Sequence, residues 1–356
     1  MTLSVGQVHA GWAWQREICK KAGSVGYVGM ITGLMDQLGR DPRLTELLTS
    51  ETQDPIQSAQ CLRLLGAVNR VALAENASWI TDYYPVFGGQ CDVDRLVPAF
   101  LTFLQDRLPA VRRELSASVQ TNEVGRAAPL SAAINYVAEA TGMPVRLLEV
   151  GASAGLNLLQ DQFFVAAGER SWGPESSALQ LTGQFKEGDP PTGTPEVVER
   201  RGCDLNPIDA RDSRCMDLLR SFVWPEHVER MTRLNAALEI ARSAPAVPID
   251  ADDACSWASE QLATCPAGQV TVLYHSLVLT YFDDAERAKF ADIVRAHGAS
   301  ATADRPLAWI SMEPSEGDSA VVEVKCELWP EGRRLLLARC TPHGGEVRWT
   351  PEEIPA

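Results

Sequence analysis

One short run constrains the fold more than any other part of this 356-residue chain. It begins at Arg146 with Arg-Leu-Leu-Glu-Val, continues through a turn that contains Gly151 and Gly155, and ends in an amphipathic stretch. This pattern predicts a buried strand, a tight turn and a helix. The two glycines would let the backbone approach a bound ligand, and the free N–H groups at a helix start would favour a polar or anionic group.

The same run allows three interpretations. A dinucleotide-binding fingerprint would need further glycines where the chain has Ser153 and Leu156, so that match is poor. The pattern G-x-S-x-G is literal, and it would make Ser153 the nucleophile of a serine α/β-hydrolase. The run also resembles the E/D-x-G-x-G/S-x-G turn of class I methyltransferases that use S-adenosylmethionine (SAM), with Glu149 two residues before the first glycine.

Residues 1–140 predict a helical amino-terminal domain. Apolar residues recur at helical spacing, for example at Tyr27, Ile31 and Leu34, and strand-like alternation is absent. A hydrolase elbow follows several earlier strands and an oxyanion loop, often of His-Gly-Gly type. Because the only His-Gly-Gly begins at His343, after the turn, the order of elements weighs against the hydrolase.

Residues 141–356 predict an α/β domain of class I methyltransferase-like, Rossmann-type architecture, with a mostly parallel sheet and a C-terminal antiparallel hairpin. Strands are expected at 197–204, 247–249, 270–274 and 306–312, helices at 231–242 and from Asp283-Asp284 to Gly298, and the hairpin at 322–338. An insertion at about 168–196 is rich in Pro and Gly and is either a lid over the site or a plain surface loop.

Composition limits the partners. With 45% hydrophobic and 22% charged residues the chain is expected to fold, and its net charge of −15, without a Lys/Arg cluster, predicts no nucleic-acid partner. No apolar run approaches the roughly 18 residues of a membrane span, and the amino terminus lacks the apolar core of a signal peptide. The nine cysteines are scattered and predict neither a metal site nor a disulfide framework. We therefore expect a reduced, cytoplasmic protein.

Several segments together are similar to an uncharacterised domain-of-unknown-function family, number 2332, whose glycine turn resembles that of SAM-dependent methyltransferases. The similarity spans roughly residues 20 to 350, and it is carried by the segments 120–126, 149–157, 201–209, 223–225 and 274–276. The resemblance to methyltransferases implies SAM as the cofactor.

The resemblance also implies which residues hold SAM. Glu149 and the glycine turn would surround its amino-acid end and ribose. Asp204 would accept the ribose hydroxyls, unless it serves only a local turn with Asn206 and Asp209. Asp253 would read the adenine, with Asp250 and Asp252 as rivals and a solvated acidic loop as the alternative. The predicted cofactor-binding residues are Glu149, Gly151, Ala152, Ser153, Gly155, Asn157, Asp204, Asp253, Ala254, His275 and Ser276.

Six residues are candidates for catalysis or substrate binding. His275 follows a predicted strand, where an imidazole can act as a general base or as a hydrogen-bond donor. Glu123 and Arg126 are expected to close the pocket, although a surface ion pair would explain their spacing. The predicted catalytic residues are His275, Glu123 and Arg126, and the predicted substrate-binding residues are Asn122, Tyr83 and Tyr84, the two tyrosines having a buried aromatic turn as their alternative.

The sequence thus predicts a SAM-dependent methyltransferase that acts on a small molecule bound between the helical and the α/β parts. The alternatives are a catalytically lapsed module that keeps the SAM fold, and a serine hydrolase with Ser153 as its nucleophile.

Overall fold

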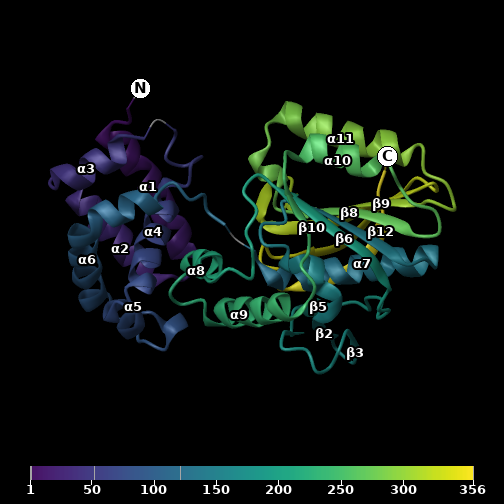
Figure 1. The fold of residues 1–356 in the computed structure, drawn as a ribbon, viewed down its shortest axis with the longest axis horizontal. Coiled ribbons are helices and arrows are strands. Elements are labelled where there is room, and N and C mark those ends of the chain that lie inside the picture. Colours follow the sequence, from purple (N-terminus) through teal and green to yellow (C-terminus); the bar gives the residue numbers. More distant parts are fainter. Residues whose placement is uncertain (1, 52, 121, 356) are drawn as a thin grey trace. The chain divides into compact units, whose positions relative to one another are not determined.

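The computed structural model describes residues 2–51, 53–120 and 122–355. The chain forms two compact units, drawn in Figure 1. The helical unit comprises Met1–Thr121 and Ser213–Thr232, and the sheet unit comprises Asn122–Asp212 and Arg233–Ala356. The chain therefore leaves the sheet unit once and returns to it.

The helical unit confirms the helical periodicity of the amino-terminal sequence. In the second helix the predicted apolar face, Tyr27, Ile31 and Leu34, is at most 1% exposed. These side chains join a core that also contains Trp12 and Phe100. Its helices are α1 (Val5–Lys21), α2 (Val25–Gln37), α3 (Pro42–Thr49), α4 (Gln60–Ala74), α5 (Ser78–Tyr83), η1 (Pro85–Phe87), α6 (Val93–Glu114), α8 (Ser213–Ser221) and the first turn of α9 (Val228–Ser243).

The segment between α8 and α9 is anchored in the helical unit by the carboxylate of Glu226. This carboxylate accepts hydrogen bonds from the Ser24 hydroxyl and the Gly26 amide, both at 2.6 Å. Both donors lie at the start of α2, where backbone N–H groups have no partner within the helix and the helix dipole favours an anion. Glu226 therefore caps a helix that lies about 200 residues earlier in the sequence.

Replacement of Glu226 by Ala is expected to lower the free energy of unfolding by about 1–3 kcal/mol, because two donors at the α2 start lose their acceptor. Urea denaturation followed by circular dichroism measures the change. Glu17→Ala, which removes a carboxylate that is 56% exposed on α1, is the control and should change stability by less than about 0.5 kcal/mol. Equal stability of the two variants would contradict the capping role.

The sheet unit contains a nine-stranded, mostly parallel sheet in the order β5-β12-β11-β10-β9-β8-β1-β6-β7. The five strands from β9 to β7 are parallel, whereas β10, β11 and β12 pair antiparallel in succession from β9. The predicted C-terminal hairpin is confirmed as β10 and β11. The strands are β1 (Val145–Val150), β5 (Phe185–Glu187), β6 (Val197–Asp204), β7 (Ile249–Ala251), β8 (Val270–Ser276), β9 (Leu307–Ser315), β10 (Asp318–Trp329), β11 (Arg333–Cys340) and β12 (Val347–Glu353).

The parallel strands contain a topological switch point beside β1. From β1 the chain adds β6 and β7 on one side, and then β8 and β9 on the other. This is the 3-2-1-4-5 order of doubly wound folds, in which ligands bind outside the carboxyl ends of the strands where the direction of winding reverses. The relevant strand ends here are those of β1 and β8.

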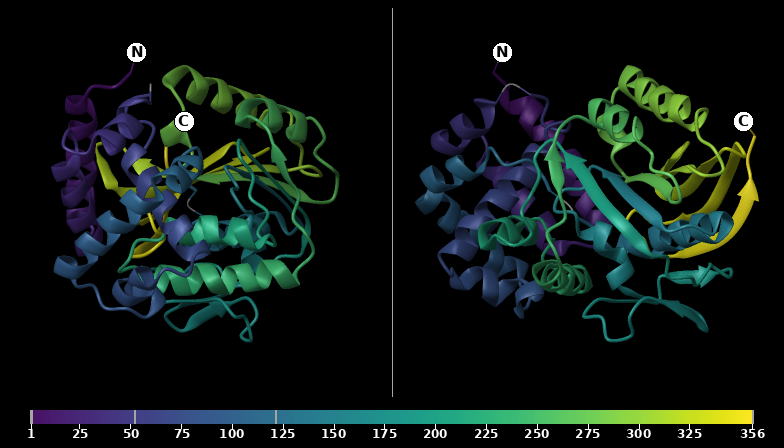
Figure 2. Two further views of the ribbon diagram at one scale, coloured as in Figure 1. Left: turned by 60° about the vertical axis from the view of Figure 1, so that its left-hand side comes forward. Right: turned by 45° about the vertical axis from the view of Figure 1, so that its right-hand side comes forward.

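Helices cover both faces of the parallel strands (Figure 2). On one face, α10 (Ala254–Leu262) and α11 (Asp284–Gly298) bury Trp257 and Phe290 against Leu148 and Val150 of β1. On the other face lies α7 (Ala127–Thr141), which contacts β8 to β11. The predicted Asp283 cap of α11 is confirmed, because Asp283 and Glu286 form a reciprocal capping box.

The prediction of an amphipathic α-helix after the glycine turn is wrong. Residues 156–162 form the 3-10 segment η3 (Leu156–Gln162), and the chain then enters β2 (Phe164–Ala167). Every side chain from Leu156 to Gln160 is buried, so the segment has no polar face and is not an amphipathic helix.

The predicted insertion at about 168–196 contains three short strands joined by turns and loops. Its strands β3 (Arg170–Trp172) and β4 (Gln180–Thr182) flank β2 in a small three-stranded sheet, and its β5 pairs with β12 of the large sheet. The strand expected at 247–249 begins two residues later, at Ile249. The strands expected at 197–204, 270–274 and 306–312 are confirmed as β6, β8 and β9.

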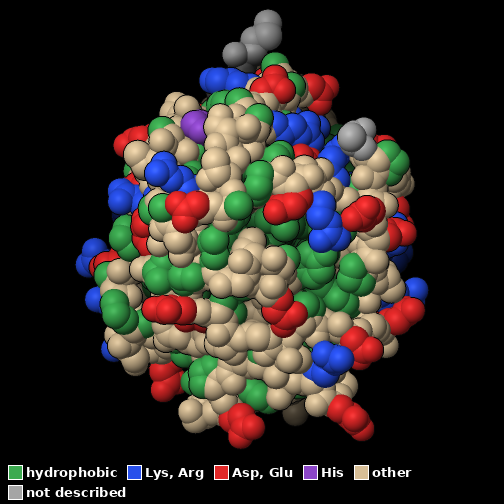
Figure 3. All heavy atoms as spheres, turned by 90° about the vertical axis from the view of Figure 1, so that its right-hand side faces the viewer, with side chains coloured by type: hydrophobic (Ala, Val, Ile, Leu, Met, Phe, Trp, Pro, Cys, Tyr) green, Lys and Arg blue, Asp and Glu red, His purple; other side chains and the backbone are tan. Residues whose placement is uncertain are grey.

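Surface and hydropathy features add two observations. None of the described helices has the length and apolar composition that a bilayer crossing requires. On the face drawn in Figure 3, acidic and basic side chains are interspersed among apolar ones, and the described residues in view form no broad patch of one sign.

Candidate functional site

The turn after β1 is built from residues with left-handed backbone conformations. Gly151, Ser153 and Gly155 have φ values of 71°, 53° and 69°. The amides of Gly151 and Ala152 both donate to the Cys203 carbonyl of β6, each at 2.9 Å. The predicted binding turn is therefore attached to the end of the neighbouring strand.

Asp204, the last residue of β6, completes this attachment. Its Oδ2 accepts the Ser153 amide at 2.9 Å, and its Oδ1 accepts the Asn206 amide at 2.9 Å. The structure thus gives Asp204 the turn-forming role that was one of its two predicted roles, while its carboxylate still lies at the carboxyl end of β6, beside the turn.

Glu149 lies at the end of β1, on the sheet face opposite α10 and α11. Its side chain is 2% exposed, and the Tyr274 hydroxyl donates to its Oε2 at 3.2 Å. Burial raises the pKa of Glu149 from its ordinary value of 4.5 to about 8, although hydrogen bonds from Tyr274 and Asn157 and the charge of Arg126 oppose the shift. In the described parts of the chain Glu149 forms no ion pair.

Three further predicted residues lie at this edge of the sheet. Asn122 Oδ1 accepts the Leu156 amide at 3.2 Å, directly after the turn. Arg126 donates from Nη1 to the Ser276 carbonyl at 3.0 Å and to its hydroxyl at 3.3 Å. Residues predicted from distant parts of the sequence therefore meet at the ends of β1 and β8.

Glu123 braces the short segment η2 (Val124–Arg126) that carries Arg126. Its Oε1 accepts the Gly125 amide at 3.2 Å, and its Oε2 lies 3.3 Å from Nδ1 of His343. A Cβ on Gly125 would collide with the His343 carbonyl oxygen, so the two segments touch through their backbones. These contacts give Glu123 a supporting position behind Arg126.

His275 lies on the opposite face of the sheet from Glu149. Its side chain is 0% exposed and packs against the rings of Phe290 and Trp309, with centroids 5.8 and 6.0 Å away. Its Nδ1 lies 2.7 Å from the Glu313 carboxylate, and its buried Nε2 has no hydrogen-bond partner. In this conformation the imidazole is enclosed beneath α11.

Asp253 and Ala254 begin α10. Asp253 is its N-cap and accepts the amides of Cys255 and Ser256 at 3.1 and 3.0 Å. Hydrogen bonds from Ser256 lower the pKa of the Asp253 carboxyl. The structure thus accounts for Asp253 by helix capping.

The two predicted substrate tyrosines belong to the helical unit. Tyr84 is 0% exposed, and its hydroxyl donates to Asn69 Oδ1 at 3.0 Å, so it is a core residue of that unit. Tyr83 is partly buried, with the Arg95 guanidinium 5.8 Å from its ring centre. For Tyr84 the structure therefore matches the buried aromatic turn that was the alternative.

Sequence reasoning missed three residues at the site: Tyr274, Val278 and Glu313. Tyr274 ends the predicted strand 270–274 and precedes His275, which was a predicted site residue. Glu313 directly follows the predicted strand 306–312. Since neighbouring parallel strands end at one edge, pairing His275 with Glu313 was within reach of the sequence. Val278 gave no signal, because its contact depends on the loop conformation.

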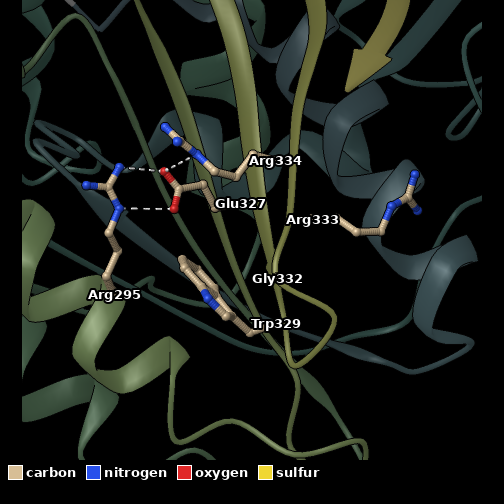
Figure 4. A pocket seen from close by; sticks show the side chains of 6 residues that line it. All are labelled: Arg295, Glu327, Trp329, Gly332, Arg333 and Arg334. Carbon is tan, nitrogen blue, oxygen red and sulfur yellow. Dashed lines mark hydrogen bonds and ion pairs between the residues drawn. The ribbon is translucent and has the colours of Figure 1, made fainter. Parts of the chain in front are cut away.

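A cavity of about 340 Å³ lies on the sheet unit between α11 and the β10–β11 hairpin. In Figure 4, Arg295 and Arg334 converge on Glu327, while Arg333 points away. Arg295 forms two hydrogen bonds to Glu327, at 2.7 and 3.1 Å, and Arg333 is paired with Glu353 at 3.1 Å. The charges of this cavity are matched internally, so it is a weaker candidate than the β1 turn.

A comparison with known protein families matches residues 10–349 to DUF2332, described as "Uncharacterized protein conserved in bacteria". The chain belongs to this family. No curated protein matches it. The description of DUF2332 names no reaction. Among the residues described, no group of three His, Cys, Asp or Glu side chains is arranged to hold a metal ion.

The buried Glu149 predicts a pH dependence. Its pKa of about 8 in the folded chain exceeds the ordinary 4.5 of an unfolded chain, so the folded state binds the additional proton. Its contribution to stability is therefore complete below pH 4.5 and is lost as the pH rises to about 8, by roughly 1.4 kcal/mol per pH unit. Glu149→Gln should remove this slope, whereas Glu169→Gln, at an exposed turn, should retain it.

Urea denaturation at pH 5, 6.5 and 8 tests this expectation. The stability difference between Glu149→Gln and the wild type should move in favour of the variant as the pH rises, by an amount on the order of a few kcal/mol. A difference that stays constant with pH would show that Glu149 is already ionised in the folded chain.

Proposed function

We propose that the chain binds SAM at the carboxyl ends of β1, β6 and β8 and transfers its methyl group to a small molecule. The proposal starts from the strand order, which puts a topological switch point beside β1. It also draws on the convergence of Glu149, Asn122, Arg126 and Asp204 at these strand ends. Switch points of this kind are the usual ligand sites of open α/β sheets.

The observation that carries the proposal is the charge of the site. Glu149 is buried without an ion pair in the described residues, and a buried carboxylate is costly until a cation compensates it. SAM carries a sulfonium and an ammonium group. A cationic ligand beside Glu149 would therefore favour the ionised form of its carboxyl group. The attraction between the carboxylate and the cation would contribute to the binding energy.

The hydrogen bonds of the turn argue against a pyrophosphate ligand. Dinucleotide sites use free backbone N–H groups at a helix start to hold phosphate oxygens. Here the amides of Gly151 and Ala152 donate to Cys203, and the amide of Ser153 donates to the Asp204 carboxylate. A 3-10 segment follows in place of a helix. The turn thus presents carboxylates where NAD or FAD would need donors.

The residues fit a SAM-sized group only in part. Glu149, Asn157 and Tyr274 would hold the cationic end, and Asp204 retains lone pairs for a hydroxyl group. Against this, Val278 packs on Gly151, and Ile249 Cδ1 lies 2.8 Å from where a Cβ of Gly155 would stand. The space next to both glycines is therefore filled by the chain's own side chains, and binding requires them to move.

Methyl transfer needs little acid–base help from the protein. The sulfonium supplies an electrophilic methyl group, so the chain's task is to align the acceptor and exclude water. Arg126 fixes the end of β8 through Ser276, and Glu123 supports Arg126. His275 retains its predicted role as a base only if its enclosure beneath α11 opens; otherwise it supports the strand end.

The proposal is tested by isothermal titration with SAM and with S-adenosylhomocysteine, using wild type, Glu149→Gln and the control Glu169→Gln. Wild type and the control should bind with micromolar affinity, and Glu149→Gln should bind SAM at least tenfold more weakly, because the carboxylate is gone. At pH 7, titrations in buffers of different ionisation enthalpy should show close to one proton released by the wild type and none by Glu149→Gln.

No binding of either ligand by titration or thermal shift would overturn the proposal. Covalent labelling of Ser153 by a fluorophosphonate would then favour the hydrolase, and the absence of labelling would favour a lapsed module. Equal affinity of Glu149→Gln and the wild type for SAM would leave the cofactor in place and remove Glu149 from its recognition.

A further inference from the structure

The loop after β8 is held by one carboxylate from β9. Glu313 Oε1 lies 2.7 Å from His275 Nδ1, and it accepts the backbone amides of Val278 at 3.0 Å and Leu279 at 3.3 Å. Leu277, between the strand and these amides, has a left-handed φ of 55°, which a branched side chain rarely adopts. A strained residue is thus followed immediately by a charge-assisted clamp, which compensates the strain.

This clamp determines where Val278 lies. The valine side chain packs directly on Gly151, so closely that a Cβ on that glycine would collide with Val278 Cγ2. Gly151 is also the first residue of the turn attached to Cys203 and Asp204. The space beside Gly151, which has no side chain, is therefore filled by Val278 in this conformation. The sequence suggested that a bound ligand would fill that space.

The tip of the loop is exposed to solvent. Thr280 and Tyr281 follow the clamped amides, and Tyr281 is 81% exposed although its ring is large and apolar. Glu313 Oε2 and His275 Nε2 are buried without hydrogen-bond partners in the described chain, so the clamp has polar atoms unsatisfied in the closed arrangement. Besides the bonds to Glu313, the Leu277 amide donates to the Met312 carbonyl at 2.9 Å, and the Arg287 guanidinium donates to the Leu279 carbonyl at 2.8 Å. An outward movement of 279–281 therefore requires the bonds to Glu313 and the bond from Arg287 to break.

We propose that Glu313 is a positioning residue for the ligand site: it holds residues 277–279 so that Val278 covers Gly151, and a ligand binds when this loop moves away. The inference rests on the proposed function, because it concerns the same turn. Apparent affinity then equals the intrinsic affinity multiplied by the fraction of molecules with the loop open. Loosening the loop, or shortening Val278, increases that fraction.

The clamp itself is tested without any ligand, by hydrogen–deuterium exchange of peptides covering 277–282. In Glu313→Ala the amides of Val278 and Leu279 should exchange at least tenfold faster than in the wild type, while β1 is unchanged. Glu313→Gln keeps one acceptor oxygen, so its exchange rates should lie between those of the wild type and those of Glu313→Ala. Glu316→Ala, which removes an exposed carboxylate from the β9–β10 turn, is the control and should match the wild type. Unchanged exchange in Glu313→Ala would overturn the clamp.

Coverage of the site is tested by titration with S-adenosylhomocysteine. Val278→Ala and Glu313→Ala should each bind it several-fold more tightly than the wild type, since both favour the open turn. General damage to the fold would weaken binding, so a gain in affinity separates positioning from a merely structural role. Faster exchange in Glu313→Ala combined with unchanged affinity in Val278→Ala would show that the loop does not cover the site.

The two proposals fail in different ways. If no variant binds S-adenosylhomocysteine, the cofactor assignment is wrong, and the accompanying claim that Val278 guards a SAM site falls with it. The exchange experiment still decides whether Glu313 holds the loop. If the wild type binds but exchange is insensitive to Glu313, the cofactor assignment stands and the clamp is refuted. Should Glu313→Ala fail to fold, Glu313→Gln and Val278→Ala retain both readouts.

Discussion

The attachment of the β1 turn to the end of β6 is the constraint on which the rest of the site depends. Three successive amides, from Gly151 to Ser153, donate either to the Cys203 carbonyl or to the Asp204 carboxylate. These bonds fix left-handed conformations that the chain would otherwise avoid, and they determine where η3 starts. With the turn fixed, Asn157 can reach back to Glu149, and Asn122 can accept the amide of Leu156.

The large sheet divides its strand ends between two chemical environments. On one face, Glu149 and Tyr274 form a buried polar pair; on the other, His275 and Glu313 are enclosed by Phe290 and Trp309. Alternation of side chains along adjacent parallel strands requires this separation, because residues 149 and 150 point to opposite faces, as do 274 and 275. Glu149 and His275 both lie at strand ends beside the switch point, but the sheet separates the carboxyl group from the imidazole.

Much of the fold follows from the sequence for clear physical reasons. The periodicity of the amino-terminal helices, the apolar strands β8 and β9 and the alternating hairpin β10–β11 are local patterns, and each predicted its element. The segment after Gly155 misled because its buried polar residues, Asn157 and Gln160, imitate one polar face of a helix. In the structure Asn157 hydrogen-bonds to Glu149, and the side chain of Gln160 is buried without a hydrogen-bond partner in the described chain. A single sequence shows neither environment.

The site could be predicted as a set of residues but not as a geometry. The positions of Glu149, Asp204 and Ser276 at strand ends follow from the parallel sheet, so their convergence was accessible. What was not accessible is the use of space beside the glycines, because Val278 and Ile249 reach Gly151 and Gly155 only through long-range packing. For the same reason Asp253 reads equally well as a ligand residue or as a helix cap until the start of α10 is known.

The return of residues 213–232 to the helical unit has a consequence for how the protein is made. Glu226 caps α2, and Asn69 donates to the Ser221 carbonyl at 3.0 Å, so the helical unit is complete only after β1 and β6 have been synthesised. When the first segment of the helical unit has been synthesised, Asn69 of α4 still lacks its acceptor, because Ser221 follows about 150 residues later. No single cut can therefore separate the two units intact, and a fragment ending before Ser221 leaves the Asn69 amide and the donors at the α2 start without their acceptors.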